Sequence, residues 1–470
     1  MVDRRATSSR RSPGAASIRP KEAGMSTVSG SAAGNPSGMT TASRTHEHHW
    51  FSEPTDPPKK SYVAWLLIGQ LVFFVALLGP AVVGLGMKIG ALQASGAIPQ
   101  GGESFNSAAA VLGGVGAFFA TVANVVFGRV SDRTTSRWGR RRIWIVLGVT
   151  IMTIAFVIMA LAPNLMLATI GWALAQTGAN MALAPFVATI ADQVPKQSHG
   201  SVTAGLGIAQ QVAIVLGIYI AGWFAPNLLV VFVVPSLFAI VALVIFAVVL
   251  PDKVLPVKPD RMSFAEVVQT FWVSPIKFPD YALAWWSRFL ITFASFGFIA
   301  FRFAYMQFHL GVPAEEVPLL IANTTLVYTG ALVLTAWAAG KISDRIGRRK
   351  IFVWTSTAIY AVGTFSLIFI NTVPQYYALE LILGLAYGIY VGVDYALVMD
   401  VLPNPDDAGK DLGVFNIANA LPQTFAPLIG GLVLLGTGGP NGSDYGVWFT
   451  LCAVACLIGA LVIFPIKKVR

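Results

Sequence analysis

Four ionisable side chains interrupt long apolar stretches in the second half of the chain. Arg288 and Arg302 fall in one stretch, and Glu380 and Asp394 fall in another. A charged group that faces lipid is costly, so we expect each of them to face a water-filled cavity or an oppositely charged partner. A carboxyl group held beside an arginine can gain and lose a proton as the pair opens and closes. These residues therefore point to reversible protonation inside a membrane.

The depths of these residues predict how they pair. If the first stretch runs outward from the cytoplasm and the second runs inward, Arg288 and Asp394 each lie about six residues from the cytoplasmic end, or roughly 9 Å. Arg302 and Glu380 each lie near the external end. We therefore predict the pairs Arg288–Asp394 and Arg302–Glu380, with Asp394 as the proton carrier and Glu380 as the next candidate. The open alternative is that either pair only holds the fold.

Amide and aromatic side chains supply a second kind of chemistry. Amides offer donors and acceptors to hydroxyl groups, and aromatic rings offer flat apolar faces, which together suit a neutral polyhydroxylated substrate. Amides also join helices within membranes, and this alternative stays open. The candidates for substrate binding are Gln70, Trp172, Gln176, Asn180, Gln210, Gln211, Asn323, Tyr387, Asn416 and Asn419.

The composition indicates that these side chains are held by membrane helices. The 470 residues are 55% hydrophobic and 11% charged, whereas a soluble domain has about a quarter of its residues charged. Several apolar runs exceed the roughly 20 residues that a spanning helix needs. The pattern predicts an all-α membrane protein with twelve transmembrane helices, over 62–87, 106–127, 143–162, 165–191, 201–225, 228–250, 283–309, 319–339, 351–371, 376–400, 412–436 and 446–465.

The net charge of +10 indicates orientation rather than nucleic-acid binding. Almost all of the basic residues lie in the tails and in alternate loops, and their short clusters are separated by membrane spans. The opposite loops hold only Lys88. Because basic loops stay inside, both termini are expected in the cytoplasm, with the protein in the cell membrane.

Two basic loops repeat, each after the second helix of a predicted six-helix half. They read Gly128-Arg-Val-Ser-Asp132-Arg-Thr-Thr-Ser-Arg-Trp-Gly139-Arg-Arg-Arg142 and Gly340-Lys-Ile-Ser-Asp344-Arg-Ile-Gly347-Arg-Arg-Lys350. A second repeated element, Asp192-Gln-Val-Pro195 and Asp400-Val-Leu-Pro403, ends the fourth helix of each half. The chain is therefore predicted to be a duplication with parallel repeats.

The predicted organisation has five segments. Residues 1–60 form a disordered cytoplasmic tail, 61–250 and 283–466 form the two halves, and 467–470 form the C-terminal tail. Residues 251–282 link the halves in the cytoplasm. An interfacial helix is expected in this linker, because Phe264, Val267, Val268, Phe271 and Trp272 recur at helical spacing.

The two basic loops resemble the signature loop of the major facilitator superfamily, and the resemblance covers residues 62–466. The longer first copy resembles that of glycoside–cation symporters and sucrose-transporter-like proteins. Two other segments resemble the same group of proteins. One is Asp411-Leu-Gly-Val-Phe-Asn-Ile-Ala-Asn-Ala-Leu-Pro-Gln423, and the other, which resembles actinobacterial members of the group, is Phe278-Pro-Asp-Tyr-Ala-Leu-Ala-Trp-Trp-Ser-Arg288. The resemblance implies a secondary transporter in which the loops hold the cytoplasmic side in one of two states. The residues that would do so are Gly128, Asp132, Arg133, Gly139, Arg140, Arg141, Gly340, Asp344, Arg345, Gly347, Arg348 and Arg349.

The chain also departs from the pattern of the family that it resembles. Sodium-coupled members carry acidic residues in helices 2 and 4, where this chain has Asn106, Asn124, Gln176 and Asn180. This favours the proton over sodium as the coupling ion. Proton/drug antiporters carry a Gly-Pro-rich motif in helix 5, but residues 210–219 contain no proline.

We therefore expect proton-coupled symport of a sugar or glycoside. The alternatives are export of drugs or metabolites by proton antiport and, less favoured, a non-transporting nutrient sensor. No nucleophile–base pair, metal cluster or nucleotide-binding loop indicates an enzyme, so no metal or cofactor is expected. The expected partners are a neutral sugar and the lipid bilayer, with the chain as a monomer and no nucleic acid.

Overall fold

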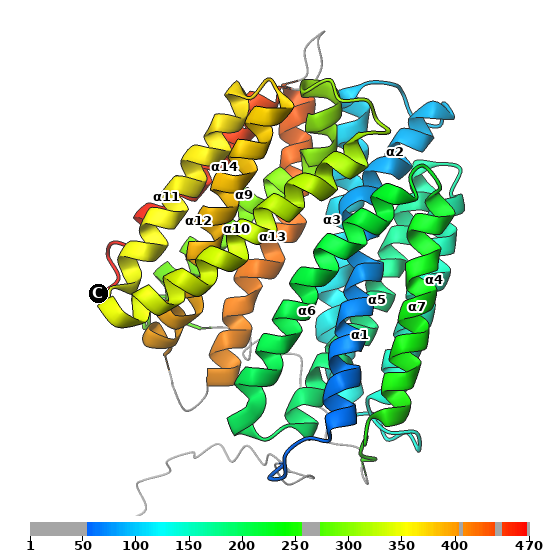
Figure 1. Ribbon diagram of the computed structural model, residues 1–470, viewed down its shortest axis with the longest axis vertical. Helices are drawn as coiled ribbons and strands as arrows, with labels where there is room; N and C mark the ends of the chain where they lie inside the picture. The colour runs from blue at the N-terminus through cyan, green and yellow to red at the C-terminus, as the bar shows by residue number, and fades with distance from the viewer. Residues whose placement is uncertain (1–53, 256–272, 404–407, 438–443, 468–470) are drawn as a thin grey trace, which may run out of the picture. The chain divides into compact units, whose positions relative to one another are not determined.

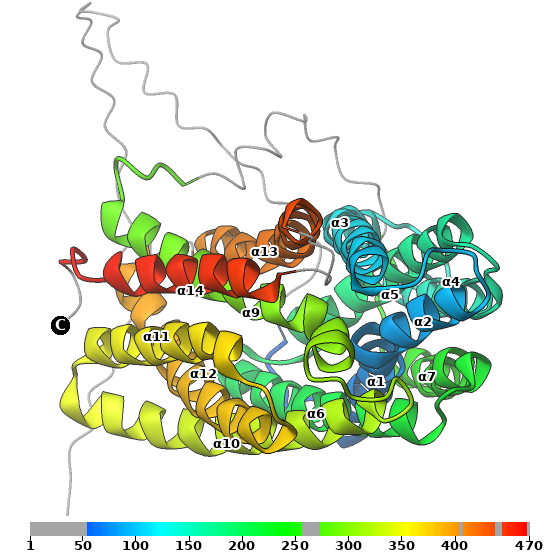
Figure 2. The ribbon, with the colours of Figure 1, turned by 90° about the horizontal axis from the view of Figure 1, so that it is seen from above.

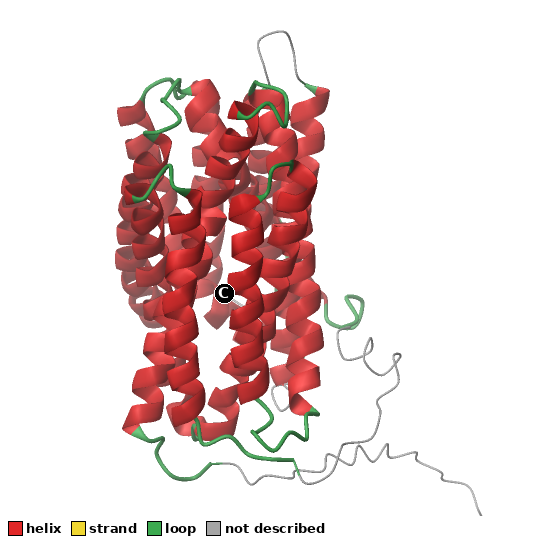
Figure 3. Ribbon diagram, turned by 90° about the vertical axis from the view of Figure 1, so that its right-hand side faces the viewer, coloured by secondary structure: helices red, strands yellow, loops and turns green. Residues whose placement is uncertain are grey.

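The computed structural model describes residues 54–255, 273–403, 408–437 and 444–467. Within these residues all regular secondary structure is helical, as Figure 3 shows, and the predicted all-α class is confirmed. The predicted interfacial helix around Phe264 to Trp272, and almost all of the predicted tail, lie outside the described residues.

Twelve helical spans follow one another along the described chain (Figure 1). Ten are long and apolar enough to cross a membrane, and α5 and the 17-residue apolar α14 complete the set. The elements are α1 (Lys60–Gly79), η1 (Pro80–Gly84), α2 (Leu85–Ala94), α3 (Gly102–Asp132), α4 (Arg142–Leu161), α5 (Leu165–Gln193), α6 (Lys196–Trp223), α7 (Leu228–Val249), α9 (Pro279–Ala304), η2 (Tyr305–His309), α10 (Val317–Ile346), α11 (Arg349–Ser366), η3 (Leu367–Phe369), α12 (Val373–Val401), α13 (Ala408–Gly436) and α14 (Tyr445–Leu461).

Several helices run past their predicted ends. The first span was expected to stop at Met87, but after the π-helical turn η1 it continues as α2 to Ala94. Lys88 therefore lies inside a helix and is buried, which corrects its assignment to a loop. Apolar runs mark only the hydrocarbon core, whereas a helix keeps its backbone hydrogen bonds into the polar interface, so charged ends such as Asp132 remain helical.

The helices form two groups with the same neighbour relations. In the first helix group, α1 to α7, helix α5 packs on α3 and α4, and α1 packs on α6 and α7. In the second helix group, α9 to α14, helix α12 packs on α10 and α11, and α9 packs on α13 and α14. Helices in matching places of the two groups thus make matching contacts, as duplicated halves should.

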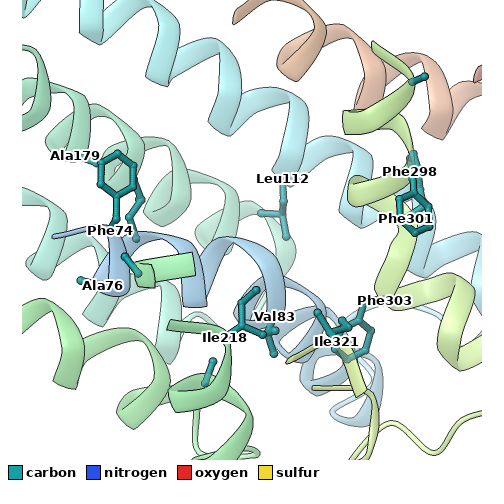
Figure 4. Close-up of a cluster of buried hydrophobic side chains, with 14 of the residues drawn as sticks. Phe74, Ala76, Val83, Leu112, Ala179, Ile218, Phe298, Phe301, Phe303 and Ile321 are labelled. Atoms are coloured by element: carbon teal, nitrogen blue, oxygen red, sulfur yellow. The ribbon is translucent and has the colours of Figure 1, made fainter. Parts of the chain in front are cut away.

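The two groups meet along α3 with α13 and along α6 with α10, and Figure 2 shows α3 beside α13. We call the end that carries residues 128–142 and 340–350 the basic end. Close contacts lie toward the opposite end, where a Cβ added to Gly431 of α13 would lie 2.2 Å from Ala110 Cβ of α3. In Figure 4, Val83 of η1 and Ile218 of α6 lie near Phe303 and Ile321 of the second helix group.

Candidate functional site

The predicted pair Arg288–Asp394 is present between α9 and α12. Arg288 Nη2 lies 2.8 Å from Asp394 Oδ2, and both side chains are buried. The guanidinium carbon lies 4.5 Å from the ring centre of Tyr395 and 4.7 Å from that of Phe415 on α13. Aromatic faces attract a guanidinium, so three elements hold this charge in place.

The second predicted pair, Arg302–Glu380, is part of a closed network. Arg302 Nη2 lies 2.7 Å from Glu380 Oε1. Arg302 Nε donates to the Tyr376 hydroxyl at 2.9 Å, while Nη1 and Nη2 donate to Thr325 and Thr324 of α10 at 2.9 and 2.5 Å. The Tyr376 hydroxyl donates to Glu380 Oε1 at 2.6 Å. Every guanidinium nitrogen of Arg302 thus has a partner, and the network joins α9, α10 and α12.

The two pairs differ in how completely their polar atoms are satisfied. Arg288 Nε and Asp394 Oδ2 have no hydrogen-bond partner among the described residues, although both are buried. The 2.8 Å contact between Arg288 Nη2 and Asp394 Oδ2 is therefore an ion pair without a well-directed hydrogen bond. Because buried polar groups are normally hydrogen-bonded, the Arg288–Asp394 pair has unused bonding capacity, whereas each guanidinium nitrogen of Arg302 has a partner.

The amides of the first helix group meet between α3 and α5. Asn124 Nδ2 donates to Asn180 Oδ1 at 3.1 Å, and Asn180 Nδ2 donates to the backbone oxygen of Gln176 at 3.0 Å. Trp172, one turn before Gln176, is placed differently. Its ring is buried against Gly116, where an added Cβ would lie 2.0 Å from Trp172 Nε1. The structure places Trp172 in the packing of α3 against α5.

The amides of the second helix group lie beside the Arg288 pair. Thr292, one turn after Arg288 on α9, donates to Asn419 Oδ1 of α13 at 3.5 Å. Asn419 Nδ2 in turn donates to Asn416 Oδ1 at 3.2 Å. Asn416 is exposed and follows Phe415, whose ring covers Arg288. The amides of α13 are therefore linked to the ion pair through Thr292 of α9 and Phe415 of α13.

The remaining candidates for substrate binding are dispersed. Asn323 of α10 accepts a hydrogen bond from the Tyr219 hydroxyl of α6 at 2.7 Å, so it joins the two helix groups. Tyr387 packs among other tyrosine rings, its centroid 5.8 Å from that of Tyr390. Gln70 of α1 is buried, whereas Gln210 and Gln211 of α6 are partly exposed.

The first basic loop is held by a charge network inside its own helix group. Arg141 Nη2 lies 2.6 Å from Asp132 Oδ1, and Arg141 Nε lies 3.0 Å from Asp192 Oδ2 at the end of α5. Arg140 also pairs with Asp192. Asp132 thus contacts an arginine at the N-terminus of α4 in its own helix group, and its role in gating stays a prediction.

The second basic loop repeats this arrangement. Arg349 lies 2.6 Å from Asp400 and 3.7 Å from Asp344. Arg349 matches Arg141 in the repeated loop, and Asp400 matches Asp192 in the second repeated element. The two repeated motifs of each half are therefore parts of one network, which sequence spacing alone did not connect.

Asp252 was not predicted as part of the first basic loop. Its Oδ2 accepts hydrogen bonds from the backbone nitrogens of Arg141 and Arg142 at 2.7 and 3.0 Å, so it caps the start of α4. A Cβ at Gly139, whose φ is +103°, would lie 2.2 Å from this carboxylate oxygen. An isolated acidic residue after Pro251, within a basic segment, was the only signal in the sequence.

Known proteins share this fold. The family model of the Major Facilitator Superfamily matches residues 71–338 and 284–470. A bacterial homologue of the human lysosomal transporter Spinster, in an inward-facing and occupied conformation, superposes with a TM-score of 0.68 at 14% identity, over 89% of this chain and 98% of that chain. The nucleoside transporter NupG superposes with a TM-score of 0.66 at 12% identity, over 87% and 100%. At these identities the likeness shows the fold alone.

Curated relatives match over shorter segments. Multidrug resistance protein MdtL of Shewanella oneidensis is 26% identical over 155 residues, which are 33% of this chain and 37% of that protein. Multidrug resistance protein 3 of Bacillus subtilis is 25% identical over 147 residues, 31% of this chain and 27% of that protein. The match thus spans about a third of the length of these relatives or less. Because the family model covers most of the chain, the chain belongs to the major facilitator superfamily and is a multi-pass membrane protein.

Proposed function

We propose that this transporter couples the movement of a neutral sugar or glycoside to protons, as a symporter working by alternating access. The observation that carries the proposal is the buried and incompletely hydrogen-bonded pair Arg288–Asp394 beside the amides of α13. It brings a group that can exchange a proton next to groups that can bind hydroxyls.

Asp394 suits the coupling proton better than Glu380. Protonation of Asp394 removes one charge of a pair in which Arg288 Nε and Asp394 Oδ2 make no hydrogen bond to the described residues. Opening the Arg302–Glu380 pair would instead disturb bonds to Tyr376, Thr324 and Thr325, and removing one partner of such a buried pair typically costs about 3–5 kcal/mol. We therefore assign coupling to Arg288 and Asp394, and a holding role to Arg302 and Glu380.

The substrate would act on this pair through α13. A sugar bound at Asn416 and Asn419 would exchange hydrogen bonds with two amides, of which Asn419 already contacts Thr292 of α9. Phe415, the residue before Asn416, lies against the Arg288 guanidinium. A shift of α13 on binding would move this ring, so that substrate occupancy and protonation favour the same state.

We assign this structure to the inward-facing state. Asn106 with Tyr445 at 3.1 Å and Tyr219 with Asn323 at 2.7 Å both join the two groups away from the basic end. If the basic loops face the cytoplasm, as the positive-inside rule predicts, these contacts close the external side. The Spinster homologue that superposes on this chain is also in an inward-facing conformation.

Uptake into proteoliposomes tests the function. Purified protein is reconstituted, a pH gradient is imposed, and a panel of labelled neutral sugars and glycosides is offered. We expect one class to accumulate against its gradient, and dissipation of the pH gradient to abolish the accumulation. Failure of every sugar to accumulate in active vesicles would contradict the proposal.

Export of drugs or metabolites by proton antiport is the second candidate. It is favoured by the partial likeness to two multidrug resistance proteins. The Asp394 carboxylate could carry the proton in either mechanism. The two candidate functions therefore differ in whether substrate moves with the protons or against them. An antiporter would move cationic dyes opposite to the proton flow and leave sugars untouched.

A further inference from the structure

We propose that Tyr395 of α12 binds the substrate on the open face of its ring, while the other face lies on the Arg288 guanidinium. One side chain would thus take part in the substrate site and in the ion pair at the same time. This inference rests on the proposed function, because it names the residue that links a bound sugar to the Arg288–Asp394 pair. Tyr395 was not among the residues predicted from the sequence.

The Tyr395 ring has one covered face and one open face. The guanidinium carbon of Arg288 lies 4.5 Å from the ring centre, which is the distance of a cation–π contact. Tyr395 is nevertheless 55% exposed, whereas Arg288 is only 6% exposed. Since the guanidinium covers one face of the ring, the exposed area lies mainly on the opposite face.

The open face of Tyr395 is on the side of α9 that is turned away from α14. Ser287, the residue before Arg288, lies toward α14, since a Cβ added to Gly459 would lie 3.2 Å from the Ser287 backbone oxygen. Successive helical residues point roughly 100° apart, so Arg288 reaches α12 and α13 instead. Helix α14 contacts α9, α11 and α13 of its own group, whereas α10 and α13 contact the first helix group. The ring is therefore placed toward the first group, where transporters built from repeats bind their substrates.

The surroundings of Tyr395 indicate the class of substrate. Asn416 of α13 is exposed and follows Phe415, whose ring centre lies 4.7 Å from the same guanidinium carbon. An amide supplies a donor and an acceptor for hydroxyl groups, and an aromatic ring supplies a flat apolar surface. A pyranose has hydroxyl groups at its rim and C–H groups on its faces, so it can use both. We therefore assign a neutral pyranose, stacked on Tyr395, as the class of substrate.

The shared ring explains how a bound sugar would act on the ion pair. When Asp394 is protonated, the Arg288 charge loses its counterion, and the aromatic faces remain to hold it. A sugar stacked on Tyr395 excludes water from the ring, and cation–π contacts strengthen when they are desolvated. Bound sugar and protonated Asp394 would therefore stabilise each other, as symport requires. Other ionisable groups that act on this guanidinium are Tyr387 and Tyr390 of α12.

The test compares Tyr395→Leu, which removes the flat ring, with Tyr395→Phe, which keeps it. Trp337→Leu on α10 is the matched control, because Trp337 is 66% exposed and also carries a cation, with Lys341 Nζ 3.9 Å from its ring centre. Thermal melting in detergent checks folding, and Tyr395→Met replaces Tyr395→Leu if the leucine variant does not fold. The full-length proteins are reconstituted, and initial rates and pH-driven accumulation are measured with labelled neutral sugars, glucose, maltose and sucrose among them.

We expect Tyr395→Leu to raise the apparent KM for the accumulated sugar about tenfold and to lower its pH-driven accumulation, because the stacking surface and the cation–π contact are both lost. Tyr395→Phe should stay close to wild type, and Trp337→Leu should match it. An unchanged KM in Tyr395→Leu, or an equal loss in Tyr395→Phe or Trp337→Leu, would overturn the role of the Tyr395 ring and leave the proposed function standing. If wild-type protein accumulates no neutral sugar under a pH gradient, the proposed function fails, and this inference fails with it.

Discussion

Arg288 of α9 and Asp394 of α12 form an ion pair, with 2.8 Å between Nη2 and Oδ2, entirely within the second helix group. The pair therefore does not lock the two groups together directly. Its opening would first change how α9 and α12 pack against each other. Because Phe415 of α13 also contacts the guanidinium, this change would reach the helix that meets α3 of the first group.

The Arg302–Glu380 pair should contribute to stability rather than to coupling. Glu380→Gln leaves the Arg302 charge buried without its counterion, which should lower the free energy of unfolding by about 3–5 kcal/mol. Thermal melting in detergent measures the loss. The protein that remains folded should still accumulate substrate in response to pH, and loss of that response at unchanged stability would instead assign coupling to Glu380.

Kinetics should distinguish an amide that binds substrate, Asn419, from an amide that joins the two helix groups, Asn323. Asn419→Ala removes a contact offered to substrate, so the apparent KM should rise with little change in the maximal rate. Asn323→Ala removes the bond to Tyr219 between the helix groups, so the maximal rate should change more than the KM. The two variants are compared by initial rates of uptake at matched expression. Wild-type affinity in Asn419→Ala would identify this amide as helix packing.

The first charge network should control turnover. Asp132→Asn removes one of the two carboxylates that Arg141 contacts and should slow transport more than it lowers the melting temperature. Asp344→Asn is the matched variant in the second loop, where the contact is longer at 3.7 Å, and its effect should be smaller. If well-expressed Asp132→Asn transports at the wild-type rate, the first basic loop only orients the protein in the membrane and does not control turnover.

Lys88 should matter for stability only. Its Nζ donates to the backbone oxygens of Ala162 and Ala160 at 2.6 and 3.1 Å, where α4 ends and carbonyl groups lack partners. Lys88→Met keeps the apolar stem but removes the donor, which should cost about 1–3 kcal/mol of stability. Transport per folded molecule should stay at the wild-type level. A specific loss of transport at an unchanged melting temperature would give Lys88 a functional role.

The depth of each residue along its helix could be predicted from the sequence. This is why both ion pairs of the second helix group could be predicted. Each apolar span fixes the level of its residues, because a helix rises about 1.5 Å per residue. Arginine and carboxylate at the same level in adjacent spans then have few other partners. The pairs Arg288–Asp394 and Arg302–Glu380 followed from this reasoning, while their roles stay predictions.

Contacts set by tertiary packing could not be predicted. Trp172, Gln176 and Asn180 recur at intervals of four residues, a spacing that favours one face of a helix, yet the Trp172 ring fills the space that Gly116 leaves on α3. Phe415 and Asp252 act through residues far away in the sequence, and nothing in their own surroundings indicates those partners. The rotation of each helix about its axis decides such contacts, and hydrophobic runs that are apolar on all sides do not encode it.

The central claim is that Asp394 exchanges the coupling proton, and the most direct test is transport by Asp394→Asn in proteoliposomes. The asparagine keeps the shape of the side chain but can no longer exchange the carboxyl proton. Downhill exchange of substrate should persist, because it needs only the alternation of the two states. Uphill accumulation under an imposed pH gradient should disappear, whereas wild-type protein in parallel vesicles accumulates substrate. If Asp394→Asn still concentrates substrate against its gradient when the pH gradient is imposed, Asp394 is not the coupling residue.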